Sequence, residues 1–367
     1  MTRNSGLRAF TLQCWDLKSN SPVCIARRVL HHFAGIAFNK LLTGRAVLAV
    51  KTPEICLIDI DPPARIQSGD GGDGGSGSGG NVGGNHTLAR SPAQACVNVA
   101  TLEDRASGNL MLAGDLVLIQ DDGGRTFVYH FETPQARAEL VDPEGNLQPE
   151  RVLDVLADHN WLIVARTTTV EIYALPTSID SNMHMEPIGR HKWQWKVDSI
   201  SLIRPTSIAA VTPIQLVLRY GSIHPWPVNL IHRYVLNLSE SFNINLSASR
   251  QNFPYVFPPL NTQVIGSPIR LMATYDMAVG SHGTIIYIDS HTETYFGHSD
   301  FGQRLAGTRI DERSPDGGVG QVGMMVRESS VYQVSERDEW TRIALEEEEG
   351  KIAIGHVNGR ITLLDYA

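Results

Sequence analysis

The clearest pattern of apolar and polar positions lies at the end of the chain, in residues 350–366. Ile352 and Ile354 alternate with small residues there, and a second apolar run begins at Ile361. Between them stands Asn358-Gly359, a dipeptide that tolerates the positive φ of a tight hairpin turn. The stretch therefore predicts two short antiparallel strands, and residues 340–345 predict a third strand before them.

The same template recurs along the chain. It fits six further stretches, at residues 44–60, 114–130, 159–173, 215–236, 277–289 and, most weakly, 323–334. A small antiparallel sheet cannot bury both apolar faces alone, whereas sheets packed radially bury both faces against their neighbours. Repeated hairpins of this kind indicate blades. We predict an all-β fold, a single β-propeller domain over residues 1–367 with about seven blades.

Two segments fall outside the repeat. Phe10–Leu17 is predicted to be a strand without a local hairpin mate, so we expect it to pair with the C-terminal strands and close the ring. Gly69–Gly84 holds ten glycines in sixteen residues. A phosphate-binding loop would need a Lys-Ser/Thr pair and a helix after it. Neither follows, and residues 69–84 are interpreted as a disordered insertion.

Composition narrows the classes of partner. A formal net charge of −8 and a pI of about 5.9 give no electrostatic case for binding nucleic acid or an anionic membrane. Four cysteines lack metal-type spacing and indicate reduced residues of an intracellular protein. Neither a signal peptide nor a run of transmembrane length is visible. We therefore expect a cytoplasmic or nuclear protein.

The most polar cluster is Asp289–Asp300, which contains His291 and His298. Its spacing matches no compact zinc motif, so an exposed loop with turn hydrogen bonds is favoured over a metal site. No nucleophile elbow, carboxylate pair or Cys-His couple is recognisable. We expect no enzyme activity, no catalytic residues, no metal and no cofactor. The alternative is an enzyme or a sugar-binding propeller that uses polar residues at its central channel.

Aromatic residues provide the candidates for a binding surface. Trp193 and Trp195 stand two residues apart, and we favour a strand that buries both over an exposed platform for a peptide or sugar. Trp226 lies between two prolines in the turn His224–Pro227, where it either anchors a partner or caps its own blade. The predicted binding residues are Trp226, His224, Arg219, His291 and His298.

The C-terminal half resembles the WD-repeat-like propeller regions of F-box proteins expanded in mushroom-forming (basidiomycete) fungi. The resemblance covers about residues 190–366. Its residues include Trp193–Leu202, Leu218–Ser222, Pro225–Leu230, Ile265–Pro268, Asp276–Gly280, Ile288–Glu293, Tyr295–His298, Gly302–Gly307 and Asp338–Arg342. In such proteins the resemblance implies a helical F-box that docks on the adaptor of a ubiquitin ligase, while the propeller presents the substrate.

This sequence departs from that plan because its first residues lead directly into a Trp-Asp-type strand. Either it is a fragment or a wrongly started gene product, or it is a propeller without the docking module. We expect a non-enzymatic protein-interaction platform, a substrate receptor or scaffold, with protein partners. A ubiquitin-ligase adaptor is an expected partner only if an F-box exists upstream.

Overall fold

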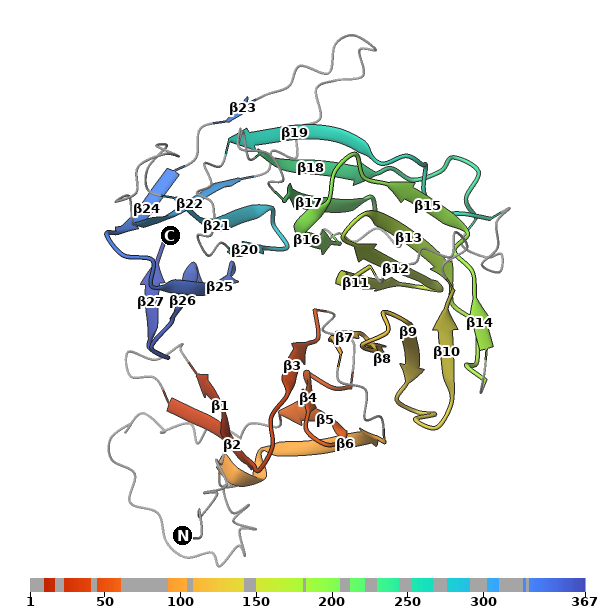
Figure 1. Ribbon diagram of the computed structural model, residues 1–367, viewed down its shortest axis with the longest axis horizontal. Coiled ribbons are helices and arrows are strands. Elements are labelled where there is room, and N and C mark those ends of the chain that lie inside the picture. Colours follow the sequence, from red (N-terminus) through yellow and green to blue (C-terminus); the bar gives the residue numbers. More distant parts are fainter. Residues whose placement is uncertain are drawn as a thin grey trace, which may run out of the picture. The chain divides into compact units, whose positions relative to one another are not determined.

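The computed structural model is all-β in the residues that it describes (Figure 1). Those residues are 10–16, 23–40, 45–60, 92–103, 108–141, 150–180, 183–204, 212–221, 230–243, 252–266, 276–290, 302–309, 326–327 and 330–366. Their helical content is one 3₁₀ turn, η1 (Pro92–Gln94), so none of them forms a helix able to cross a membrane. Residues 69–84 lie outside the described ranges, and their interpretation as an insertion stays a prediction.

The chain divides into two compact units. Unit 1 comprises Met1–Ile119 and Val128–Arg137, and unit 2 comprises Gln120–Phe127 and Ala138–Ala367. Unit 1 contains a two-stranded and a four-stranded sheet, β1 (Phe10–Asp16)-β2 (Val23–Leu30) and β3 (Gly35–Phe38)-β4 (Leu48–Lys51)-β5 (Ile55–Ile60)-β6 (Cys96–Leu102). Their shared core is built by Leu30, Leu48, Val50 and Ile58.

A five-stranded sheet follows, with the order β14 (Met183–Met185)-β10 (Arg137–Leu140)-β9 (Thr126–His130)-β8 (Leu116–Gln120)-β7 (Leu110–Ala113). The next two sheets are β11 (Val152–Asp158)-β12 (Trp161–Arg166)-β13 (Thr169–Ala174)-β15 (Gly189–Lys192) and β16 (Val197–Ile203)-β17 (Ile214–Tyr220)-β18 (Leu230–Leu236)-β19 (Leu260–Gly266)-β23 (Val326–Arg327). The last two are β20 (Asp276–Val279)-β21 (Thr284–Ser290)-β22 (Gln303–Arg309)-β24 (Ser330–Ser335) and β25 (Trp340–Glu346)-β26 (Lys351–His356)-β27 (Ile361–Asp365).

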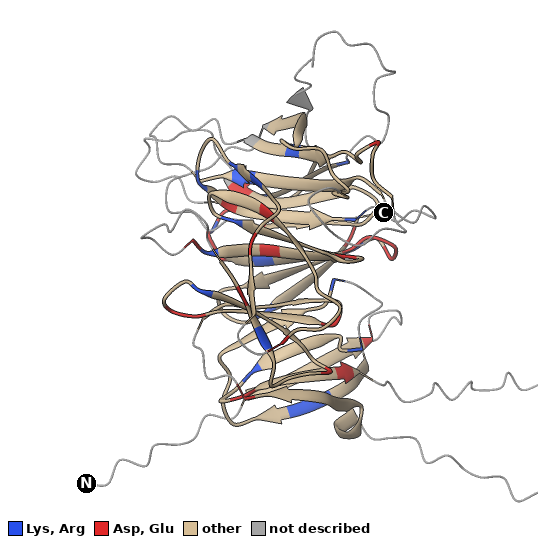
Figure 2. Ribbon diagram, turned by 90° about the vertical axis from the view of Figure 1, so that its right-hand side faces the viewer, with Lys and Arg blue, Asp and Glu red and all other residues tan. Residues whose placement is uncertain are grey.

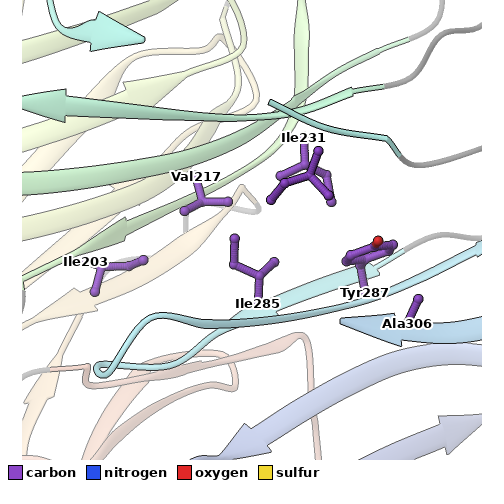
Figure 3. Close-up of a cluster of buried hydrophobic side chains, with 7 residues drawn as sticks. Ile203, Val217, Ile231, Ile285, Tyr287 and Ala306 are labelled. Atoms are coloured by element: carbon purple, nitrogen blue, oxygen red, sulfur yellow. The ribbon is translucent and has the colours of Figure 1, made fainter. Parts of the chain in front are cut away.

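Consecutive sheets of unit 2 pack face to face through alternate residues of their strands. On β21, Ile285 and Tyr287 face Val217 and Ile231 of the preceding sheet (Figure 3). The intervening residues of β21 join a second core with the last sheet, whose members are Ile286, Ile288, Leu305, Trp340, Ile352 and Ile354. Successive side chains of a strand point to opposite faces. One sheet therefore belongs to two cores, as a blade of a β-propeller does.

Two parts of the predicted architecture are corrected. The described residues form six sheets of three to five strands and a separate two-stranded sheet, rather than about seven blades. The weak repeat at 323–334 forms no hairpin of its own, because β24 pairs with β22 as the fourth strand of an existing sheet. The premise of the predicted ring closure is also wrong, because the N-terminal strand has a local partner: β1 pairs with β2, whose residues Ala26 and Leu30 bury the same face of the hairpin.

Polar side chains also join neighbouring sheets of unit 2. The carboxylate of Asp154 on β11 accepts a hydrogen bond from the amide of Leu202 on β16, at 2.7 Å. Asp276 on β20 accepts from the amide of Ile343 on β25 in the same way, at 2.9 Å. Both bonds run from the first strand of one sheet to the first strand of another. Because they are directional, they fix the position of one first strand against the other in a way that apolar packing alone does not.

Candidate functional site

The structure describes one of the five residues that were predicted to bind a partner. Trp226 and His224 fall in residues 222–229, which join β17 to β18 and lie outside the described residues. His291 and His298, in residues 291–301, lie outside them too. Arg219 is described, and it is fully buried on β17. The strand lies inside its sheet with both faces covered, so Arg219 does not contribute to an exposed binding surface.

An exposed aromatic residue lies elsewhere, in the short connection between β15 and β16. Trp193 is buried with 4% of its surface exposed, whereas Trp195 is 49% exposed. The prediction that both are buried is therefore correct for Trp193 and wrong for Trp195. The physical reason is that β16 begins only at Val197. The alternation of a strand does not apply to residues before its start.

Backbone hydrogen bonds hold this connection at both ends. The amide of Trp193 donates to the carbonyl of Thr168 at 2.8 Å, and the amide of Val197 donates to that of Thr167 at 2.7 Å. The carbonyl of Lys196 accepts from the amide of Gly221 at 2.8 Å. Trp195 is thus presented by a segment whose ends are fixed on the turn between β12 and β13 and on the end of β17.

A group of aromatic rings supports the exposed indole. Trp195 meets Tyr220 edge-on, with ring centroids 5.3 Å apart, and Tyr220 meets His232 at 5.0 Å. The hydroxyls of Tyr220 and Tyr234 are hydrogen-bonded at 2.9 Å. Tyr234 in turn lies 5.4 Å from the ring of Trp193. We call these five residues the aromatic cluster. Edge-to-face contacts of this kind stabilise beyond the area that they bury, so Trp195 stands on an ordered base.

The cluster is electrically neutral at physiological pH. Burial lowers the pKa of His232 to about 4, so its imidazole carries no charge. The Nδ1 atom of a neutral imidazole can accept the Asn261 amide, which lies 3.1 Å away. Burial also raises the pKa of Tyr220, which stays protonated and able to donate a hydrogen bond. These groups are suited to support and recognition rather than to proton transfer near pH 7.

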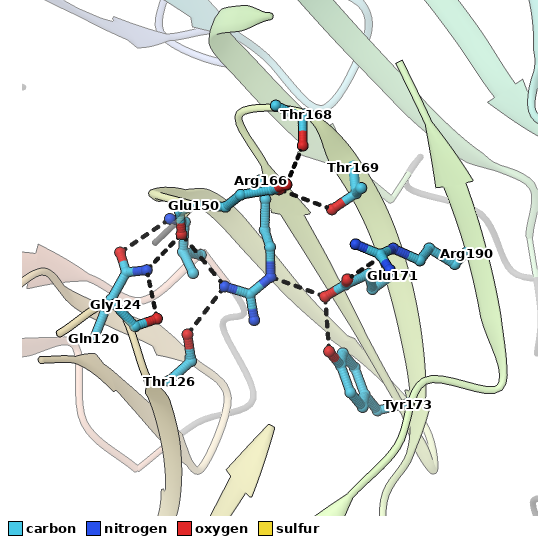
Figure 4. A network of polar contacts seen from close by, with 11 residues as sticks. Gln120, Gly124, Thr126, Glu150, Arg166, Thr168, Thr169, Glu171, Tyr173 and Arg190 are labelled. Carbon is cyan, nitrogen blue, oxygen red and sulfur yellow. Dashed lines mark hydrogen bonds and ion pairs between the residues drawn. The ribbon is translucent and has the colours of Figure 1, made fainter. Parts of the chain in front are cut away.

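A buried ionic network lies beneath the turn that carries the connection (Figure 4). One oxygen of Glu171 accepts from Arg166 at 2.8 Å and from the Tyr173 hydroxyl at 2.7 Å. Its other oxygen lies 3.3 Å from Nε of Arg190. Glu150 accepts from the hydroxyls of Thr168 and Thr169. Residues 166–169 are therefore fixed by charged hydrogen bonds, and through them the position of Trp195 is fixed as well.

Sequence reasoning missed the rings that support Trp195. Tyr220 is the last residue of β17, while His232 and Tyr234 are two residues apart on β18 and so share a face. That spacing was a usable signal. The hairpin predicted at residues 215–236 is confirmed by the antiparallel pairing of β17 with β18, but a predicted hairpin does not show which of its side chains meet Trp195.

The described part of the chain offers few other candidate sites. No group of three or more His, Cys, Asp or Glu residues there is arranged to hold a metal ion. Unit 1 contains a cavity of about 410 Å³, which is lined by Thr101, Glu103, Tyr129, Pro134, Gln135 and Arg137. The aromatic cluster is the better defined of the two candidates, because its contacts fix an exposed side chain in one position.

Comparison with known proteins gives likenesses of fold only. No protein-family model matches the sequence, and no curated protein matches it. A solved complex of KlAtg21 with the coiled coil of AgAtg16 is similar at 8% identity and a TM-score of 0.46, covering 91% of this chain and 81% of that chain. Kluyveromyces lactis Hsv2 is similar at 8% identity and a TM-score of 0.45, covering 92% of this chain and 75% of that chain.

Proposed function

We propose that this chain is a non-enzymatic protein-interaction platform whose partner docks on Trp195 and the aromatic cluster. The observation that carries the proposal is the half-exposed indole of Trp195, held between two fixed backbone positions. Tryptophan is among the residues most enriched at interface hot spots. An anchor that is already ordered loses little conformational entropy when a partner docks.

The contribution of Trp195 to the binding free energy follows from the area of its exposed surface. A tryptophan side chain buries on the order of 150–250 Å², so the exposed half of Trp195 offers about 100 Å². At about 25 cal/mol per Å², covering it contributes about 2.5 kcal/mol to binding. That is a substantial part of the free energy of a complex of micromolar affinity, which is about 8 kcal/mol.

At a finer level, we propose a cytoplasmic or nuclear substrate receptor or scaffold related to F-box proteins. The resemblance of residues 190–366 to the propeller regions of fungal F-box proteins supports this. Both Trp193 and Trp195 belong to the segments that carry the resemblance. Docking to a ubiquitin ligase would need an F-box, so the genomic DNA upstream of the codon for Met1 should be searched for a reading frame that encodes one.

The test uses two tryptophans of nearly equal exposure. Trp195→Ala should abolish the capture of protein partners by the tagged chain, and Trp15→Ala, at a site 47% exposed in unit 1, should not. Both variants should keep the melting temperature within a few degrees, since each removes an exposed side chain. Identical partner sets for wild type and Trp195→Ala would refute the proposal. Binding of free oligosaccharides that Trp195→Ala abolishes would favour the sugar-binding alternative instead.

A further inference from the structure

Three basic residues lie next to the connection that carries Trp195. Lys192 and Lys196 flank it in sequence, and both are exposed. Arg151 is exposed as well, and its carbonyl accepts a hydrogen bond from Thr167, the residue whose own carbonyl accepts from Val197. Two successive backbone hydrogen bonds thus link Arg151 to the segment of Trp195.

Two described acidic residues lie next to these positions in sequence, Glu150 and Asp198, and both are partly buried. The two carboxylate oxygens of Glu150 accept hydrogen bonds from Thr168 and Thr169. Within the described residues, Arg151, Lys192 and Lys196 form no ion pair with an acidic side chain. Among the described residues, the exposed charge next to Trp195 is therefore positive, although the whole chain has a formal net charge of −8.

Figure 2 shows acidic and basic residues mixed over the strands on the side that it presents. Near Trp195, exposed basic residues adjoin the segment that carries an exposed apolar ring. We propose that the partner segment recognised at Trp195 is acidic, an extended peptide that places an apolar residue on the indole and carboxylates beside Lys192 and Lys196. This inference rests on the proposed function and specifies the chemistry of its partner.

The small number of cations favours a peptide over other anionic partners. Recognition of an anionic lipid surface typically uses clusters of four to eight Lys and Arg residues. Nucleic-acid binding typically uses a basic stripe on one face of a basic domain. Three cations next to the segment of one exposed aromatic ring match a short peptide with a few carboxylates and one apolar anchor. Their charges also set which partner is rejected, because a basic segment would meet like charges there.

The probe for this inference is a short fluorescein-labelled peptide of Glu and Asp around one central Leu. Its affinity for the intact chain is measured by fluorescence anisotropy. We expect Lys192→Glu/Lys196→Glu to weaken binding of the peptide about tenfold. Each substitution replaces an attraction between a lysine and a peptide carboxylate with a repulsion between two carboxylates, and such interactions at a protein surface are weak. Raising the salt concentration about tenfold should weaken binding by the wild type in the same direction. The melting temperature should be unchanged, because both lysines are exposed.

A matched control changes the same charge elsewhere in unit 2. Arg337→Glu/Arg360→Glu alters two exposed residues of the last two sheets and should leave affinity unchanged. If this control weakens binding as much as the lysine variant does, attraction is a property of net charge and the inference is overturned. It is overturned too if a peptide with Gln and Asn in place of the acids binds equally well.

The outcomes separate this inference from the proposed function. If the neutral peptide binds as tightly and Trp195→Ala still abolishes binding, the anchor stands and the acidic partner is wrong. If the acidic peptide binds and Trp195→Ala has no effect, the anchor itself is wrong. Tighter binding of phosphatidylserine-containing vesicles or single-stranded DNA than of the peptide, lost in the lysine variant, would assign the patch to those ligands and overturn the inference.

Discussion

Replacing Glu171 with Ala tests how much of the support beneath Trp195 is electrostatic. The carboxylate is 1% exposed and accepts hydrogen bonds from Arg166 and Tyr173, while Arg190 lies close to its second oxygen. Removing it leaves the guanidinium of Arg166, itself 8% exposed, without its ionic partner. Breaking a buried ion pair from one side typically costs 3–5 kcal/mol. We expect the free energy of unfolding to fall by about 3–5 kcal/mol.

Urea titration followed by far-ultraviolet circular dichroism measures this loss. Asp365→Ala is the comparison, because Asp365 pairs with Lys351 at 2.9 Å but its side chain is 80% exposed, so its loss should cost less than about 1 kcal/mol. Arg166→Met/Glu171→Leu should be less destabilising than Glu171→Ala, since the buried guanidinium of Arg166 is removed together with its carboxylate partner. The reasoning fails if Glu171→Ala costs no more than Asp365→Ala.

Two further predictions concern pH and close packing. Because burial lowers the pKa of His232 from 6.5 to about 4, the unfolded chain binds this proton more readily than the folded chain. Stability should therefore fall as the pH decreases from 6.5 to about 4, by up to about 2–3 kcal/mol, and an identical pH profile for His232→Gln would contradict this. At Gly307 an added Cβ would lie 2.8 Å from the carbonyl oxygen of Ile285, so Gly307→Ala should cost about 1–3 kcal/mol in urea titration. Gly35→Ala, where the added atom meets nothing within 4 Å, should cost clearly less, and equal losses would be evidence against the steric explanation.

Local chemistry was enough to predict the turns. The hairpin predicted at Asn358-Gly359 has its glycine at φ 82°, and Gly124 of a second predicted hairpin turn is at φ 81°. In both turns, a glycine occupies the position that needs a positive φ, and this preference can be recognised from the turn sequence alone. The alternation of apolar residues likewise predicted strands β26 and β27 close to their observed bounds.

The partner with which a strand pairs could not be predicted in the same way. Gly323–Val334 carries enough alternation to suggest a hairpin, but β24 completes the sheet of β22. Phe10–Leu17 was assigned a distant partner although Val23–Leu30 lies close by in sequence. Which edge a strand joins depends on contacts that short sequence windows do not contain. The exposure of Trp195 was missed for a related reason, since it depends on where β16 begins.

Strand β21 contributes side chains to two hydrophobic cores, and this arrangement protects it against errors in strand pairing. Ile285 and Tyr287 face one neighbouring sheet, and Ile286 and Ile288 face the other. A slip of one residue would send each pair into the wrong core and turn every side chain of the strand to the opposite face. Because both faces are packed, neither can absorb such a slip by turning toward solvent. Packing on both faces therefore holds β21 in a single register, even though the sheets around it are small and similar to one another.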